Sequence, residues 1–181
     1  MKLKEINHET IKWFHGINTK KEIIKWINNR PEQWTFEETI DWLYEYNKKR
    51  LYSKNNNEYI FIIINDKNEK VGYTQIINHD TINNKAELGV VIDPNYQNKG
   101  YGERAIREII KLAQSQLKIH KLFVKIREDN EDSLKFFEKI GFTKESLLKD
   151  EIYQDNKYWN FYLLILINKR KESKSKNNKK G

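Results

Sequence analysis

The sequence predicts an α/β (α+β) fold in which a mixed, mostly antiparallel sheet of six to seven strands carries helices on both faces. Its 181 residues are enough for one domain with a substantial core and too few for two. Short runs of β-branched and aromatic residues alternate with segments of helical periodicity. Two pairs of these runs are separated by short polar turns, as in antiparallel hairpins.

The N-terminal part is predicted to hold one strand followed by helices. We expect the strand over residues 2–7 and one or two helices over residues 8–29, ended by Pro31. The next helix starts at Thr35, which forms a capping-box pattern with Glu38 three residues later. The residues expected to face the core on this helix are Phe36, Ile40, Leu43 and Tyr44.

Two further strands are predicted before the most informative segment. Residues 58–64 and 71–77 are rich in β-branched side chains, and the polar turn 65–68 joins them. The loop 79–84 then returns the chain to a central strand that begins at Lys85.

The central strand leads into a long helix. Residues 87–92 are mostly aliphatic, and Pro94 prevents further ladder bonding. From about Tyr101 the spacing of apolar residues becomes helical. The positions that recur at this spacing are Ala105, Ile106, Ile109, Ile110, Ala113 and Leu117.

A second strand and a short helix follow. Apolar residues alternate over 122–126, and a helix is expected over 132–140. Asp129 or Asn130 can cap its start, and Gly141 ends it.

The last predicted elements are two strands over about 143–153 and 157–167, joined by the turn 154–157. Residues 169–181 have no apolar side chain, and we expect them to form a disordered basic tail. Residues 168–181 carry a net charge of +6, so most of the chain's net charge of +8 lies there and little is left for the rest.

The loop between the central strand and the long helix has features of an anion site. Its sequence is Gln97-Asn98-Lys99-Gly100-Tyr101-Gly102. A helix N-terminus offers unpaired N–H groups and a partial positive charge, and glycines let an anion approach that backbone. Two interpretations remain open: a pyrophosphate site built from main-chain donors, or a tight turn with glycine in a left-handed conformation.

A nicotinamide-dependent enzyme is the less favoured interpretation of the same glycines. Gly100, Gly102 and Ala105 satisfy the dinucleotide-binding spacing, and Glu128 lies near the position of a ribose-binding acid. That fingerprint belongs to a series of parallel βαβ units. Here only one short helix and a hairpin follow.

Two motifs lie in order between residues 85 and 142. Gln97-x-x-Gly100-x-Gly102 follows a strand ending in Asp-Pro and precedes the long helix. The second motif is Asn130-x-x-Ser133-x-x-Phe136-Phe137-x-x-x-Gly141-Phe142. The pair resembles the GCN5-related N-acetyltransferase (GNAT) superfamily, most closely its branches that acetylate protein N-termini, polyamines or amino sugars. We therefore expect an acetyltransferase domain over residues 1–168 and the tail over 169–181.

The resemblance implies transfer of the acetyl group of acetyl-CoA to a primary amine, by direct attack in a ternary complex. The backbone of Val90, Val91 and Ile92 would pair with the pantetheine arm, and a central-strand N–H would meet the developing oxyanion. The cofactor-binding residues that it implies are Val90, Val91, Ile92, Gln97, Asn98, Lys99, Gly100, Tyr101, Gly102, Asn130, Ser133 and Phe137.

Glu87 is the candidate base, because the family often has a glutamate in the central strand that deprotonates the acceptor through water. A strand glutamate can equally pair with a basic residue or hold the acceptor's ammonium group. Tyr73 and His79 are weaker candidates. Phe137 stands where many members have a proton-donating tyrosine, so water, Tyr153 or Tyr158 would protonate the thiolate.

The acceptor-binding candidates are Trp34, Glu37 and Tyr73. Glu37 belongs to an acidic helix that also carries Glu38, Asp41 and Glu45. A solvated acidic face is the usual explanation of such a helix. The other interpretation is a wall of the acceptor groove that attracts a cationic amine.

Composition limits the remaining possibilities. The chain has no cysteine, which excludes disulfides, thiolate metal sites and a cysteine nucleophile. No apolar run approaches the ~20 residues of a membrane span, and the start lacks a signal-peptide core, so we expect a cytoplasmic enzyme.

The expected partner is a small-molecule amine or a protein N-terminus, without a metal or membrane, and a homodimer is possible by family precedent. The alternatives are a non-catalytic acyl-CoA-binding module and a ribosome- or RNA-associated protein that uses the tail.

Overall fold

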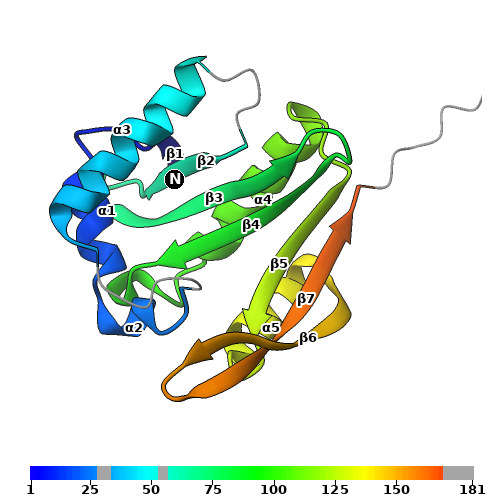
Figure 1. Cartoon of the computed structure of the whole chain (residues 1–181). Coiled ribbons are helices and arrows are strands. Elements are labelled where there is room, and N and C mark those ends of the chain that lie inside the picture. The colour runs from blue at the N-terminus through cyan, green and yellow to red at the C-terminus, as the bar shows by residue number, and fades with distance from the viewer. Residues whose placement is uncertain (28–33, 53–56, 169–181) are drawn as a thin grey trace, which may run out of the picture.

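A computed structural model of the chain describes residues 1–27, 34–52 and 57–168. All the strands in these ranges belong to one seven-stranded sheet in the order β1-β2-β3-β4-β5-β7-β6 (Figure 1). Only β4 and β5 are parallel neighbours, which confirms the predicted mixed, mostly antiparallel sheet. The strands are β1 Lys2–Glu5, β2 Tyr59–Ile64, β3 Lys70–Asp80, β4 Lys85–Ile92, β5 Lys121–Arg127, β6 Thr143–Gln154 and β7 Lys157–Ile167.

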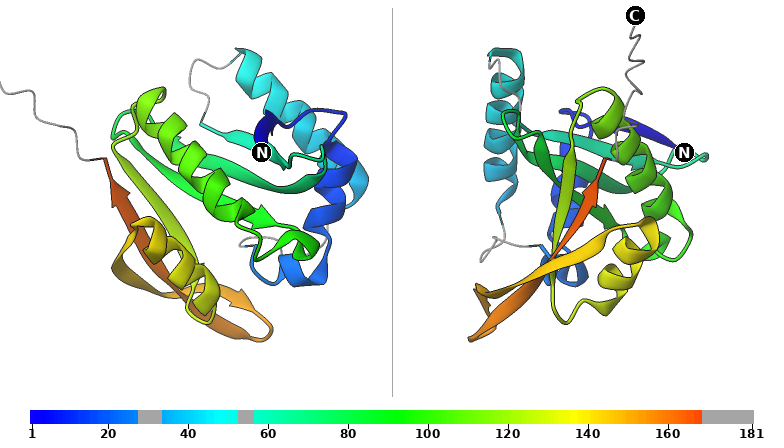
Figure 2. Two further views of the ribbon diagram at one scale, coloured as in Figure 1. Left: turned by 180° about the vertical axis from the view of Figure 1, so that it is seen from behind. Right: turned by 90° about the vertical axis from the view of Figure 1, so that its right-hand side faces the viewer.

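Helices cover both faces of this sheet (Figure 2). One core lies beneath α4 and α5, where Ile106 and Ile109 pack with Leu88 and Leu122. A second core lies beneath α1, α2 and α3 on the opposite face, around Phe14. The helices are α1 Ile11–Asn18, α2 Lys21–Ile24, α3 Phe36–Tyr52, the 3-10 helix η1 Pro94–Tyr96, α4 Tyr101–Ser115 and α5 Glu131–Ile140.

The two parallel strands in the middle of the sheet separate soon after they meet. β4 and β5 pair only at Lys85–Lys121, Ala86–Leu122 and Glu87–Phe123. Beyond Glu87, β4 pairs only with β3, and beyond Phe123, β5 pairs only with β7. The strands diverge in a V, open at the ends of both strands (Figure 1), and β4 has an unpaired backbone edge along it.

Helix α3 begins as predicted but presents a different side to the core. The capping box forms, since Thr35 N–H donates to Glu38 at 2.7 Å and Glu38 N–H donates to Thr35 Oγ1 at 3.2 Å. Of the predicted core residues only Leu43 is buried, whereas Phe36, Ile40 and Tyr44 are 39, 45 and 67 % exposed, so this prediction is wrong for three of them.

The reason is a contact between α3 and β2 that the helical pattern alone does not reveal. Tyr46 is 3 % exposed, and its hydroxyl accepts a hydrogen bond from Ile60 N–H at 3.1 Å. Its ring also stacks on Trp42, which stacks on Phe14 of α1. These contacts turn Leu43 and Tyr46 toward the core and Thr39 toward His15 of α1, and they leave the three mispredicted residues exposed.

Two turns bear on the functional candidates. The loop expected over 79–84 is shorter, because β3 continues to Asp80, so His79 lies in the strand. The hairpin turn near 154–157 forms, and Asp155 and Asn156 have φ angles of 53° and 62°, as a type I′ turn requires. The predicted tail lies outside the described residues.

Candidate active site

The loop between β4 and α4 has the geometry of an anion site. Asn98 and Gly100 adopt positive φ angles of 59° and 77°. In the described part of the chain, no hydrogen bond runs from the backbone N–H groups of residues 98–102 to another residue. A Cβ added to Gly100 would meet no atom within 4 Å, so the space beside the first turn of α4 is open. Free main-chain donors at the start of a 15-residue helix fit a diphosphate.

Side chains at the edges of this loop hold its shape. Asp93 Oδ1 accepts from Asn95 N–H at 3.1 Å, and Asp93 Oδ2 lies 2.7 Å from Lys20 Nζ of the α1–α2 connection. Gln97 Nε2 donates to Ile92 O at 3.1 Å. Lys99 Nζ donates to Asn95 O at 2.8 Å. The Gln97 and Lys99 side chains thus brace the loop.

The predicted pantetheine-binding residues lie on the two arms of the V. Val90, Val91 and Ile92 belong to the part of β4 that no strand pairs on the β5 side. Across the opening, Asn130 caps α5, and its Oδ1 accepts from Ser133 N–H at 3.2 Å. The sequence left the choice between Asp129 and Asn130 open, and the cap is Asn130.

Phe137 lies further along α5, in an aromatic cluster. Its side chain is 6 % exposed, and its ring centroid lies 5.0 Å from that of Phe136 and 5.2 Å from that of Phe142. Tyr153 and Tyr158, the suggested substitutes for a proton-donating tyrosine, contact each other near the β6–β7 turn, with ring centroids 5.0 Å apart. Each is 62 % exposed.

Glu87 stands at the apex of the V, at the last residue of β4 that pairs with β5. Its Oε2 accepts from Asn78 Nδ2 at 3.0 Å. Burial raises the pKa of the Glu87 carboxyl, while the Asn78 hydrogen bond and the charge of Lys125 oppose that rise. Lys125 is itself paired, with its Nζ 2.6 Å from Glu151 Oε1. A half-buried carboxyl with a raised pKa is a stronger proton acceptor than an exposed one.

The three acceptor-binding candidates are not brought together in one cluster. Tyr73 is 4 % exposed beneath α1, where its hydroxyl donates to Asn18 Oδ1 at 2.7 Å. Trp34 lies beside Trp42, with ring centroids 6.4 Å apart. Glu37 is exposed in the first turn of α3. All three belong to the part of the molecule that α1, α2 and α3 cover.

His79, a weaker candidate for the base, is half-buried near the end of β3. In the described part of the chain neither ring nitrogen has a hydrogen-bond partner. Burial lowers the pKa of the His79 imidazole, and the nearby charge of Asp80 opposes this.

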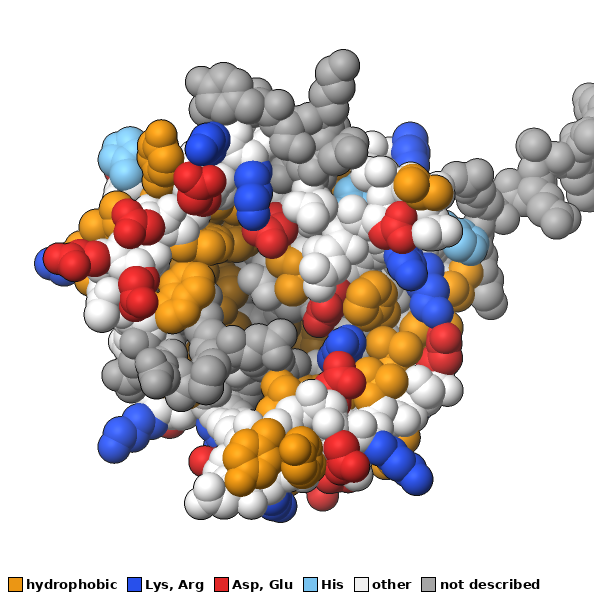
Figure 3. Space-filling view, viewed as in Figure 1, with side chains coloured by type: hydrophobic (Ala, Val, Ile, Leu, Met, Phe, Trp, Pro, Cys, Tyr) orange, Lys and Arg blue, Asp and Glu red, His pale blue; other side chains and the backbone are white. Residues whose placement is uncertain are grey.

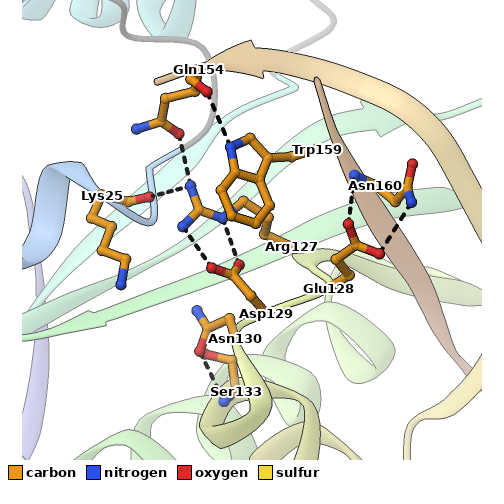
Figure 4. Close-up of polar contacts among 9 residues, drawn as sticks. All are labelled: Lys25, Arg127, Glu128, Asp129, Asn130, Ser133, Gln154, Trp159 and Asn160. Atoms are coloured by element: carbon orange, nitrogen blue, oxygen red, sulfur yellow. Dashed lines mark hydrogen bonds and ion pairs between the residues drawn. The ribbon is translucent and has the colours of Figure 1, made fainter. Parts of the chain in front are cut away.

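Sequence reasoning missed a network around Arg127 at the end of β5 (Figure 4). Its guanidinium binds both carboxylate oxygens of Asp129, at 2.7 and 3.1 Å. It also donates to Lys25 O at 3.2 Å and to Gln154 Oε1 at 2.9 Å. Trp26 and Trp159 contact it through their rings, at 4.7 and 4.2 Å from the guanidinium carbon. The only sequence signal is a charged residue directly after the alternating apolar residues of β5.

The face that carries α3 and the β6–β7 hairpin is hollowed between them (Figure 3). Acidic side chains gather over α3, and the exposed acids of this helix include Glu37, Asp41 and Glu45. Within the described ranges, no helix is long and apolar enough to cross a membrane. No cluster of three or more potential metal-binding side chains occurs in the same ranges.

Comparison with known proteins places this geometry in a family. Residues 2–143 match the model described as "Acetyltransferase (GNAT) domain". The chain is similar to spermidine N(1)-acetyltransferase of Escherichia coli (strain K12), with 23 % identity over 160 residues that cover 88 % of this chain and 82 % of that protein.

Two solved structures share the fold. Spermidine N-acetyltransferase from Vibrio cholerae in complex with CoA and spermine superposes with a TM-score of 0.82 at 22 % identity, covering 92 % of this chain and 94 % of that one. A dodecameric structure of the Vibrio cholerae enzyme gives a TM-score of 0.76 at 21 % identity and covers 92 % of each chain. The chain thus belongs to the GNAT acetyltransferase family and is an acetyl-CoA-dependent N-acetyltransferase that acts on an amine.

Proposed function

We propose that the acceptor is a small polyamine of the spermidine class and that Glu87 takes its proton through water. The observation that carries the proposal is the position of Glu87, a half-buried carboxyl at the point where β4 and β5 separate. Burial raises its pKa, which suits a group that must accept a proton from an ammonium ion. The exposed acids of α3 favour approach of a cation over that of an anion.

Similarity to spermidine acetyltransferases over most of both chains supports a polyamine over other amines. A primary amine with a pKa near ~10.4 is almost entirely protonated at neutral pH. Loss of its proton toward Glu87 frees the nitrogen lone pair, which bonds to the acetyl carbon as the carbon–sulfur bond breaks.

In this proposal the departing thiolate receives its proton through water from the newly acylated nitrogen, which must lose one more proton to become the amide nitrogen. Phe137 has no proton to donate, and both hairpin tyrosines are largely exposed. A thiol with a pKa of ~8.5 leaves readily enough without a dedicated acid.

We propose that acetyl-CoA, which supplies the activated thioester, is held by backbone more than by side chains. The N–H groups of residues 98–102 bind the diphosphate, and the unpaired edge of Val90, Val91 and Ile92 binds the pantetheine arm. The Asn130 side-chain amide lies on the other arm, and in the described part of the chain its Nδ2 donates no hydrogen bond, so it remains available to the ligand.

We also propose that the chain self-associates. The support is the dodecameric assembly of a protein with the same fold, together with the exposed Phe36, Ile40 and Tyr44 on α3. Light scattering coupled to size-exclusion chromatography tests this, and a monomer at micromolar concentration contradicts it.

An acceptor screen tests the proposed function. Release of free thiol from acetyl-CoA is followed with spermidine, spermine, an aminoglycoside, an amino sugar and a peptide with a free N-terminus. We expect the highest kcat/KM for a polyamine. A higher kcat/KM for the peptide would contradict the polyamine assignment while leaving the acetyltransferase activity intact.

The role of Glu87 is tested on the best acceptor of that screen. Glu87→Gln should lower kcat/KM by about 10²–10⁴ at neutral pH, the range of general-base catalysis, without weakening CoA binding. The matched control is Glu145→Gln on β6, which removes an ion pair with Lys121 at 2.9 Å outside the site. Undiminished turnover in Glu87→Gln would remove Glu87 from the mechanism.

A further inference from the structure

Helix α2 connects the ends of the two strands that form the V. Just before α2, Lys20 Nζ lies 2.7 Å from Asp93 Oδ2, at the end of β4. Just after α2, Lys25 O accepts from Arg127 Nη1 at 3.2 Å, at the end of β5. The short helix therefore lies across the open end of the V, with one attachment to each arm.

The attachment to β5 depends on Arg127. Its side chain is 4 % exposed, and the charge is compensated by the bidentate pair with Asp129. The same guanidinium joins Lys25 and Trp26 at the end of α2 to Gln154 and Trp159 of the β6–β7 hairpin. A second bond ties the hairpin together, since Trp159 Nε1 donates to Gln154 O at 3.1 Å. The buried Arg127 side chain thus connects the end of β5, the end of α2 and the β6–β7 hairpin.

Strand geometry puts Arg127 on the same face of the sheet as Glu87. Phe123 is the direct neighbour of Glu87 in β5, and alternate residues of a strand share a face. Lys125 and Arg127 therefore follow Phe123 along the face that α1, α2 and α3 cover. Because two residues of strand span roughly 6.6 Å, Arg127 lies about two such steps from the neighbour of Glu87, toward the open end of the V.

We propose that Arg127 is a positioning residue for the acceptor amine: it fixes the end of α2 and the β6–β7 hairpin as the outer wall of the acceptor path that ends at Glu87. This inference rests on the proposed role of Glu87 as the base for the acceptor, and not on which amine is used. The bidentate pair with Asp129 compensates the charge of Arg127 itself, so this guanidinium adds no net charge to the wall. Arg127 has no described contact with the free edge of β4 or with the loop 97–102, so we expect CoA binding by these segments to change little when the guanidinium is removed. The Asn130 N–H donates to the Arg127 carbonyl at 2.9 Å, and this backbone bond persists in any Arg127 variant.

Arg127→Met tests the inference by keeping an apolar side chain of similar length while removing every guanidinium contact. With the best amine of the screen, we expect KM for the amine to rise at least tenfold, with the Kd of CoA from calorimetry changed less than threefold. Arg127→Lys keeps the charge but not the planar stacking or the bidentate pair, so its amine KM should be intermediate. Trp159→Phe keeps a stacked ring and should have the smallest effect.

A stability control separates positioning from general destabilisation. Ile119→Ala removes a fully buried side chain just before β5, in the core beneath α4 and at the end of the V where β4 and β5 pair. If this variant, matched in loss of Tm, raises the amine KM as much as Arg127→Met, the inference is wrong. A loss of CoA affinity in place of amine affinity also overturns it.

Hydrogen exchange gives a readout that does not depend on turnover. Arg127→Met should increase backbone exchange in residues 20–27 and 150–160 and leave residues 97–102 unchanged. An exchange pattern unchanged in both outer segments would contradict the inference even if every amine of the screen proved a poor acceptor.

Discussion

Glu87 shows how one side chain carries a cost in stability because of its place in the site. Burial raises the pKa of its carboxyl above the ordinary value of 4.5, whereas the unfolded chain retains that ordinary value. Between these two values the native state holds a proton that the unfolded state has lost. Stability therefore falls as the pH rises through this window, and the loss persists above the folded pKa.

Removal of this charge should accordingly stabilise the protein at neutral and alkaline pH. Glu87→Gln keeps an oxygen that accepts from Asn78, so the hydrogen bond at 3.0 Å can persist. We expect its Tm in scanning calorimetry to equal or exceed that of the native chain at pH 8, with a smaller difference at pH 5. A variant less stable than the native chain at pH 8 would contradict the raised pKa.

At the scale of elements, the loop before α4 depends on the backbone conformation of Gly100. Its φ of 77° is costly for a residue with a side chain, by about 1–2 kcal/mol. Gly100→Ala should therefore destabilise the protein by roughly that amount and weaken CoA binding about tenfold or more, because the new Cβ enters the open space beside the donors. Isothermal titration with CoA measures the second effect.

Gly16→Ala is the matched control for that substitution. Gly16 lies inside α1 without a positive φ, and a Cβ there meets no atom within 4 Å. The change should stabilise the protein by about 0.5–1 kcal/mol through helix propensity and leave CoA affinity unchanged. Equal CoA affinities in the two variants would remove Gly100 from the anion site.

The start of α3 depends on the Thr35 hydroxyl, which accepts from Glu38 N–H. Thr35→Ala should lower the free energy of unfolding by about 0.5–2 kcal/mol in urea denaturation. Thr19→Ala serves for comparison, because that exposed hydroxyl donates to a carbonyl at the end of α1 and caps no N-terminus. A larger loss at Thr19 than at Thr35 would show that the capping box contributes little.

At the scale of the whole molecule, net charge separates the enzyme from an RNA-associated protein. Most of the +8 charge belongs to residues 168–181, which follow the last described strand in the sequence. Deletion of residues 169–181 should leave kcat and KM for the best small amine within about twofold, because every residue that we assign to the site lies before residue 169. A loss of turnover in the truncated chain would give the tail a catalytic role.

How much of the fold follows from sequence depends on how far apart the interacting residues lie. The Thr35–Glu38 box, the Asn130 cap and the 155–156 turn arise between neighbours, and the patterns predicted each or narrowed it to two residues. The side of α3 that faces the sheet was predicted wrongly, because Tyr46 binds a strand that the helical pattern does not contain.

The same difference between local and long-range contacts holds for the candidate site. The loop 97–102 and Glu87 lie in one continuous segment, so the family resemblance could nominate them, and their roles stay predictions. The Arg127 network joins residues up to 102 positions apart, and no local pattern predicts such a contact. Whether Trp34, Glu37 and Tyr73 bind the acceptor remains a prediction for the kinetic experiments.

The short parallel pairing of β4 and β5 has a consequence for how the free energy of unfolding depends on the concentration of CoA. Three residue pairs join these strands, so a pantetheine arm bound between them would act as an additional strand and connect the two parts of the sheet. Saturation at a hundred times Kd would add about 2.7 kcal/mol to the free energy of unfolding. Acetyl-CoA and free CoA both carry the pantetheine arm, so either one would stabilise the protein throughout turnover. We expect this stabilisation to be lost only when the total concentration of both forms falls.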